Sequence, residues 1–244
     1  MPLLNVSVAA AKIAKYATSE SGDTLELIER PMGGLSLVLA DGQRSGKAAK
    51  SISNIVTRKA IALLAEGVRD GAVARAAHDY LRTMRGGKVS ATLNIVSVDL
   101  ATETIVISRN SHCPTVVFQS GQLTLLDQPS KPVGIHTWTK PWITELPLVA
   151  DTFVVTYTDG VMHAGGHGDE RVDVPALLQR WRSEGQFAAQ ALADAILSQA
   201  ADLDRGRPAD DISVVVVCVQ SVADDTDGVR RLSARFPVRV FRDG

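Results

Sequence analysis

Residues 35–46 read LSLVLADGQRSG, and the rest of the chain is organised around this stretch. Its first half is a short apolar run of the kind that fills a buried strand. The run stops at Asp41-Gly42, and Gly46 then begins a long segment with helical spacing. A carboxylate at the end of a buried strand, beside a glycine that allows close backbone approach, is a natural metal or catalytic position. Asp-Gly is also typical of a turn, and Asp before Ser-Gly of a helix cap, so both interpretations stay open here.

The remaining segments follow one another in long blocks of strand and helix patterns. Strands are predicted over residues 3–10, 11–18, 25–29, 35–40, 91–100, 104–108, 115–118, 123–126, 142–148, 152–158 and 212–219. Helices are predicted over residues 46–67, 73–84, 174–182 and 187–203. Such blocks, without β-α-β alternation, indicate an α+β fold with mostly antiparallel sheets. We expect two sheets packed face to face, each covered on its outside by a helix pair.

The chain has the size of one large domain with a small appendage. We expect one domain over residues 1–220 and a C-terminal extension over 221–244, with an arginine-rich strand or hairpin at Val229–Phe241 packed on the same domain. That arginine run is interpreted as a solvated face, although phosphate or acidic surfaces are its other candidate ligands.

Composition excludes several classes of function. The formal net charge is −1 and no basic stripe is present, so nucleic-acid binding has no electrostatic support. No apolar run approaches the roughly 18 residues that span a bilayer, and the first residues lack a signal-peptide core. The two cysteines lie far apart and favour reduced thiols. We therefore expect a cytoplasmic protein that binds neither nucleic acid nor membrane.

Acidic residues recur at strand ends and in adjacent turns, at Asp23, Asp41, Asp159 and Asp210-Asp211. Carboxylates at strand ends of packed sheets can converge at one rim, where they repel one another unless cations are bound. Oxygen ligands without nearby Cys or His select Mg²⁺ or Mn²⁺. Two such ions about 3.5–4 Å apart can hold a hydroxide for attack on a phosphoryl group. The alternative is four independent turn aspartates, which the shared context makes a poor explanation.

These segments resemble the motifs of the metal-dependent type 2C (PPM) protein serine/threonine phosphatases, and more closely their bacterial SpoIIE/RsbX-type branch. Tyr157–Val161 (YTDGV) and Pro208–Ser213 (PADDIS) are the most specific matches. Further similar segments are Ser21–Asp23 (SGD), Ala40–Gly46 (ADGQRSG), Ser90–Leu93 (SATL) and, loosely, Ser108–Pro114 (SRNSHCP). The resemblance covers about Ser19 to Val219.

The resemblance implies a two-sheet sandwich flanked by helices, with two Mn²⁺ or Mg²⁺ ions between the sheets. It implies that Asp41 bridges both metals, that the Gly42 carbonyl binds one, and that Asp159 and Asp210 bind the other. Asp23 is implied to bind a metal or its water, which makes Asp23, Asp41 and Asp159 the predicted catalytic residues. Asp211 completes the predicted metal set as the carboxylate that orients the ligands.

The resemblance also implies a function. The implied reaction is hydrolysis of phosphoserine or phosphothreonine on a protein partner. Stand-alone relatives of the RsbX type act on regulators in partner-switching or stressosome pathways, so an anti-sigma antagonist or a stressosome protein is the implied substrate. The alternative is a phosphatase-like binding module without turnover. A nucleotide-binding domain is disfavoured, because neither of the glycine pairs Gly33-Gly34 and Gly165-Gly166 stands at the start of a helix.

Some positions depart from the family pattern. Arg44 stands where the family loop usually has glycine, and Gln43 cannot serve as a histidine general acid. His163, His167 and Asp169 can be interpreted as a metal cluster, although the glycines around them favour a flexible loop. For His112 a turn-stabilising role is favoured over a catalytic one. Cys113 is not followed by the C-x₅-R pattern of a thiol phosphatase.

Overall fold

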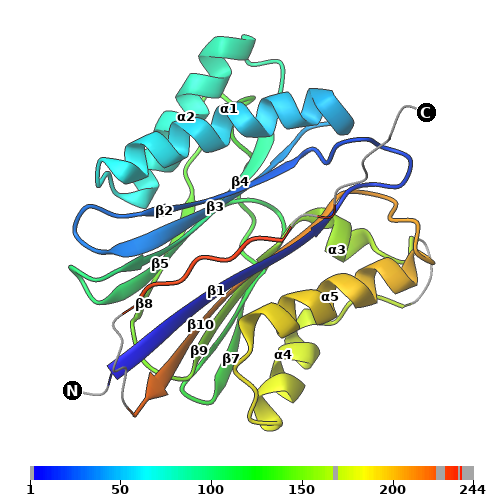
Figure 1. Cartoon of the computed structure of the whole chain (residues 1–244). Coiled ribbons are helices and arrows are strands. Elements are labelled where there is room, and N and C mark those ends of the chain that lie inside the picture. Colours follow the sequence, from blue (N-terminus) through cyan, green and yellow to red (C-terminus); the bar gives the residue numbers. More distant parts are fainter. Residues whose placement is uncertain (1–2, 167–169, 224–228, 236, 238–244) are drawn as a thin grey trace, which may run out of the picture.

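The computed structural model describes residues 3–166, 170–223, 229–235 and 237. It consists of two five-stranded sheets packed face to face between two layers of helices (Figure 1). Every strand pair among these residues is antiparallel. The predicted α+β sandwich is therefore confirmed.

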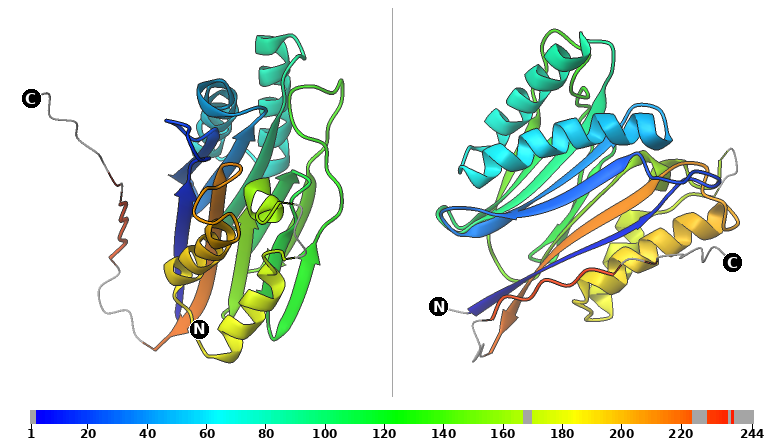
Figure 2. Two further views of the ribbon diagram at one scale, coloured as in Figure 1. Left: turned by 90° about the vertical axis from the view of Figure 1, so that its right-hand side faces the viewer. Right: turned by 45° about the horizontal axis from the view of Figure 1, so that its top comes forward.

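The element bounds define the four layers. Sheet A contains, in spatial order, β1 (Leu3–Ile13), β10 (Ile212–Val222), β9 (Thr152–Tyr157), β6 (Thr115–Gln119) and β7 (Gln122–Leu126). Sheet B contains β2 (Asp23–Glu29), β3 (Gly34–Gly42), β4 (Ala91–Asp99), β5 (Thr104–Asn110) and β8 (Trp142–Pro147). The helices are α1 (Gly46–Ala65), α2 (Asp70–Arg85), α3 (Asp159–His163), α4 (Val174–Ser183) and α5 (Ala189–Leu203). Figure 2 shows α1 and α2 outside sheet B, and α4 and α5 outside sheet A.

Alternation along β3 explains why this strand is buried on both faces. Leu37 and Leu39 point into the core between the sheets, whereas Val38 and Ala40 pack under α1 and α2. The same holds for β10, where Val215 and Val217 face sheet B, and Val214 and Val216 face the helices of sheet A. Strands covered on both faces read as continuous apolar runs, as these two do.

Local structure differs from the sequence-based expectation at three places. The strands predicted at 3–10 and 11–18 are one strand, because β10 pairs with β1 without interruption as far as Ile13↔Ile212. The short helix α3 was not predicted, since its sequence follows directly on β9. Residues 229–235 form no strand or hairpin, and the rest of Val229–Phe241, apart from Pro237, lies outside the described residues.

In the described part of the extension, Arg230 Nη1 forms an ion pair with Glu29 Oε2 of the domain at 3.1 Å, between two exposed side chains. Such an exposed pair contributes little to stability. Among the described residues, no helix has the length and apolar character needed to cross a membrane.

Candidate functional site

Asp23 and Asp41 lie directly opposite each other in the ladder between β2 and β3. Asp23 is the first residue of β2, and Asp41 is the penultimate residue of β3. Like charges in directly opposed positions of an antiparallel pair are destabilising. The ladder therefore presents two carboxylates at one end of sheet B.

Three glycines next to these motifs allow backbone to approach closely. A Cβ atom on Gly42 would lie 2.1 Å from the carbonyl oxygen of Ala49, and one on Gly22 would lie 2.5 Å from the Ala49 side chain. A Cβ atom on Gly160 would lie 2.2 Å from the carbonyl oxygen of Asp211. No side chain fits at such distances, so the glycines let α1 and the start of β10 come close to the carboxylates.

Asp23 connects the two sheets. Its Oδ2 accepts hydrogen bonds from Ser213 Oγ at 2.6 Å and from Thr158 Oγ1 at 3.0 Å. Ser213 belongs to β10 of sheet A, and Thr158 joins β9 to α3. The other oxygen, Asp23 Oδ1, is buried and has no hydrogen-bond partner. A buried carboxylate oxygen without a partner is costly, and a cation would satisfy it.

The shifted pKa values indicate that the four predicted aspartates lie near one another at this end of the molecule. Burial, followed by the charges of Asp23, Asp159 and Asp210, raises the pKa of Asp41 to about 9. Burial raises the pKa of Asp23 to about 6, against the lowering effect of its two hydroxyl donors. The pKa of Asp210 is also raised, by burial and by the nearby Asp159. The carboxylates thus lie near enough to oppose one another's ionisation.

Asp211 holds the loop that leads into β2. Its Oδ1 accepts the backbone N–H of Lys15 at 2.9 Å, and its Oδ2 accepts that of Gly22 at 2.8 Å. Asp211 is buried, whereas Asp210 beside it is half-buried. Asp211 therefore positions the segment that carries Asp23.

Two lysines approach the carboxylates, and sequence reasoning missed both. Lys12 Nζ and Lys50 Nζ donate to the same backbone carbonyl, that of Asp23, at 2.5 and 2.7 Å. Burial, followed by the charge of Lys50, lowers the pKa of Lys12. Thr158 and Ser213 were also missed, although they stand within the quoted motifs YTDGV and PADDIS.

The residues present fit divalent cations. The donor set consists of carboxylate oxygens, which hard cations prefer, and includes the unpartnered Oδ1 of Asp23. Within the described ranges, no group of three or more Asp, Glu, His or Cys side chains lies in an arrangement that could hold a metal ion as it stands. The carboxylates form an open group whose mutual repulsion a cation would relieve.

A sequence profile of the Stage II sporulation protein E (SpoIIE) family matches residues 31–220. The chain belongs to the SpoIIE family. No curated protein matches the sequence.

Solved structures show the same fold for SpoIIE-type and other type 2C phosphatases. The phosphatase domain and a regulatory fragment of SpoIIE from Bacillus subtilis have a TM-score of 0.75 at 20% identity, over 92% of this chain and 66% of that one. RsbX in complex with magnesium has a TM-score of 0.68 at 13% identity, over 90% of this chain and 100% of the other. The catalytic domain of PstP in complex with two manganese ions has a TM-score of 0.66 at 18% identity, over 90% of this chain and 100% of that one.

Arg44, at the position where the family loop usually has glycine, adopts a backbone conformation typical of glycine. Arg44 has φ +84°, in the left-handed region that glycine adopts without strain. The departure from the family pattern therefore changes the side chain and leaves a glycine-like backbone. Its side chain is exposed.

Two histidines flank Asp159 in this SpoIIE-family site. His112 Nε2 and His163 Nδ1 lie 3.7 and 3.9 Å from Asp159 Oδ2, and their rings stack with centroids 6.5 Å apart. Both side chains are exposed. His167 and Asp169, the other members of the predicted histidine cluster, lie outside the described residues.

Cys113 is buried and free, and burial, followed by the charge of Asp159, raises its thiol pKa to about 12. Because the thiolate is the nucleophilic form, such a thiol is not poised for catalysis.

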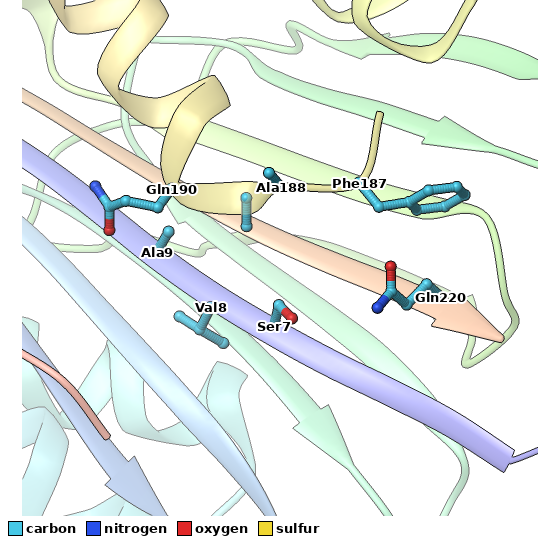
Figure 3. Close-up of a pocket in the computed structure, with 8 residues that line it drawn as sticks. Ser7, Val8, Ala9, Phe187, Ala188, Gln190 and Gln220 are labelled. Atoms are coloured by element: carbon cyan, nitrogen blue, oxygen red, sulfur yellow. The ribbon is translucent and has the colours of Figure 1, made fainter. Parts of the chain in front are cut away.

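A hollow of the described surface lies away from the carboxylates. It measures about 480 Å³ and opens between β1 and the start of α5 (Figure 3). Ser7, Val8, Phe187 and Gln220 are among its lining residues, and none of the lining side chains is ionisable. Gln220 lies far along β10 from Asp210-Asp211. This hollow therefore lacks the carboxylates that make the other end of the sandwich the candidate site of this SpoIIE-family chain.

Proposed function

We propose that the chain is a Mn²⁺- or Mg²⁺-dependent protein phosphatase that hydrolyses phosphoserine or phosphothreonine on a protein partner in the cytoplasm. The proposed partner is a regulator in a bacterial partner-switching or stressosome pathway. Another solved structure of this fold, with a TM-score of 0.65 at 15% identity, comes from work on the bacterial stressosome. The SpoIIE family and two structures of the same fold, RsbX with magnesium and PstP with two manganese ions, support this proposal.

One observation carries the proposal: Asp23 faces Asp41 in the β2–β3 ladder, and Asp159 and Asp210, which follow β9 and precede β10, lie near enough to raise the pKa of Asp41. A structural role alone does not account for this arrangement, because it destabilises the fold without a cation. Perturbed carboxylates of this kind are typical of functional sites.

Each residue has a proposed task. Asp41, the Gly42 carbonyl, Asp159 and Asp210 would hold two cations, and Asp23 would hold a cation or a water molecule bound to it. When bound, the cations supply a hydroxide nucleophile at neutral pH and offset the charge of the phosphoryl oxygens. Thr158 and Ser213 orient Asp23 by hydrogen bonds to Oδ2, which leaves Oδ1 available for a cation or its water. Asp211 keeps the Asp23 segment in place.

A binding module without turnover remains the second candidate. The observation that favours it is Arg44, which places an exposed guanidinium group in the loop next to Asp41. That cation is suited to retain a phosphorylated segment.

The test combines turnover and melting temperature. After chelation, wild type should hydrolyse an aryl phosphate and a phosphoserine peptide only when Mn²⁺ or Mg²⁺ is added. Asp41→Asn and Asp159→Asn should reduce turnover by at least about 100-fold, because they remove a ligand. Mn²⁺ should raise the melting temperature of wild type more than that of either variant.

Asp202→Asn, which changes a carboxylate on α5, is the matched control and should behave as wild type. Activity that survives exhaustive chelation would refute the metal mechanism. Wild type that shows no turnover but binds the phosphopeptide equally well after Asp41→Asn would support the binding module.

A further inference from the structure

Two tryptophans are exposed beside β8, the edge strand of sheet B. The exposed fraction of Trp138 is 86%, and that of Trp142 is 47%. Both line a hollow of about 340 Å³ formed by the loop of residues 127–141 and the start of β8. Burying a large aromatic side chain contributes much favourable free energy. An exposed pair of them around a hollow therefore indicates an interaction site.

The hollow combines apolar walls with positive charge. Its lining residues are Pro129, Ser130, Lys131, Trp138, Thr139, Lys140, Pro141 and Trp142. Both ionisable members, Lys131 and Lys140, are basic and exposed. The complementary ligand is therefore a segment that carries carboxylates next to an apolar side chain.

Hydrogen bonds hold the walls in place before any ligand arrives. Thr139 Oγ1 donates to the carbonyl of Lys131 at 3.2 Å, and Asn110 Nδ2 donates to the same carbonyl at 2.9 Å. At the start of the loop, buried Arg109 donates to the carbonyl of Gln128 at 2.6 Å. A preformed hollow lowers the entropy cost of binding.

The same contacts attach the hollow to the carboxylate end of the molecule. Asn110, which holds the loop, is followed by Ser111 and then by His112, whose ring lies 3.7 Å from Asp159. Farther along the loop, Val133 forms a bridge with Ala91, and Ala91 pairs with Gly42. Two separate connections thus run from the hollow to the proposed metal ligands.

We propose that this hollow docks an acidic segment, with one apolar anchor, of the phosphorylated protein substrate. The apolar side chain packs between Trp138 and Trp142, and the carboxylates pair with Lys131 and Lys140. A segment seated there brings the residues next to it in its own chain toward Asp41 and Asp159. This inference rests on the proposed phosphatase function and adds to it the chemistry by which the substrate is recognised.

The first experiment measures binding without turnover. The probes are dye-labelled, unphosphorylated peptides that differ only in one segment: Glu-Leu-Glu, Lys-Leu-Lys or Gln-Ser-Gln. Fluorescence anisotropy with the metal-free full chain should show tightest binding for Glu-Leu-Glu. Trp138→Ala should weaken that binding by about 10-fold or more, as expected for an aromatic anchor. Because this side chain is exposed, the fold should survive.

Two matched controls separate docking from general surface effects. Met32→Ala removes another exposed apolar side chain, at the opposite end of β2 and β3, and should leave binding unchanged. Combined Lys131→Glu and Lys140→Glu should reverse the preference toward Lys-Leu-Lys, whereas Arg58→Glu on α1 should not. Equal binding of all three peptides, or equal loss in Trp138→Ala and Met32→Ala, would overturn the proposal.

The second experiment distinguishes this inference from the proposed function. With Mn²⁺, Trp138→Ala should raise KM for a phosphoserine peptide containing Glu-Leu-Glu and leave turnover of an aryl phosphate unchanged. If wild type hydrolyses neither substrate, the phosphatase function fails, while the anisotropy result still tests the hollow. If wild type hydrolyses both and Trp138→Ala alters neither, the docking site is refuted and the phosphatase stands.

Discussion

Among single residues, Asp23 has two oxygens in contrasting surroundings. Oδ2 accepts two hydroxyl hydrogen bonds, whereas Oδ1 is buried without a partner. An unsatisfied buried acceptor costs about 1–3 kcal/mol, and more when it is charged. The hydroxyls of Thr158 and Ser213 therefore fix the orientation of the Asp23 carboxylate and leave Oδ1 available to bind a cation.

The raised pKa values of Asp41 and Asp23 predict how stability depends on pH. An aspartate in the unfolded chain has a pKa near about 3.9, so it loses its proton before the folded one does. Without metal, the free energy of unfolding should fall as pH rises from about 4, through about 6 for Asp23, toward about 9 for Asp41. Urea unfolding in the presence of a chelator measures this slope.

Asp41→Asn should flatten the slope, because the amide does not ionise. Saturating Mn²⁺ should reverse it, since metal binding requires deprotonated carboxylates. A metal-free protein whose stability rises over the same interval would contradict the prediction.

Arg44 should carry backbone strain that is separable from its charge. A non-glycine residue in the left-handed region costs of order 1–2 kcal/mol. Arg44→Gly should therefore raise the free energy of unfolding by up to about 1 kcal/mol after the entropy cost of glycine is subtracted. Arg44→Ala keeps the strain and removes the charge, so it should not raise stability. Chemical denaturation of the three proteins measures the difference.

Among elements, the contact between β3 and α1 depends on a missing side chain. Gly42→Ala would place a Cβ atom 2.1 Å from the Ala49 carbonyl oxygen, so the strand and helix must separate. We expect a loss of about 1–3 kcal/mol in unfolding free energy, together with weaker Mn²⁺ binding. Denaturation curves and metal titration measure the two effects.

Gly71→Ala is the matched control. At this position in the first turn of α2, the added Cβ atom meets only side-chain atoms, at 3.4 Å or more. Alanine should be neutral or stabilise the helix by about 0.5–1 kcal/mol. Equal effects of the two substitutions would show that the close approach of β3 to α1 is unimportant.

For the whole molecule, the core between the sheets should dominate stability. Leu39 is 1% exposed and lies between the sheets, two residues before Asp41. Leu39→Ala should lower the unfolding free energy by about 2–5 kcal/mol. Leu100→Ala, at a side chain 45% exposed, should change it by less than about 1 kcal/mol. Thermal and chemical unfolding check both values, and similar losses would contradict the assigned core.

Local patterns of residues determined much of this architecture. The apolar run of β3 indicated a buried strand, because a strand covered on both faces consists mostly of apolar residues. Helical spacing identified α1, α2, α4 and α5 to within a few residues. The Asp-Gly and Asp-Asp motifs predicted the candidate metal ligands, because metal binding depends on the residue type and on close backbone approach at an adjacent glycine.

The tertiary structure alone decided which other groups meet the carboxylates. The pairing of β1 with β10 extended the strand to Ile13, and it brought Lys12 close to Asp23. The sheets' packing placed Ser213 against Asp23 Oδ2 across 190 positions of chain. The hollow around Trp138 likewise depends on Asn110 and Arg109, which are distant in sequence. Hydrogen bonds, burial and charge repulsion depend on distances in space, and a local pattern does not contain them.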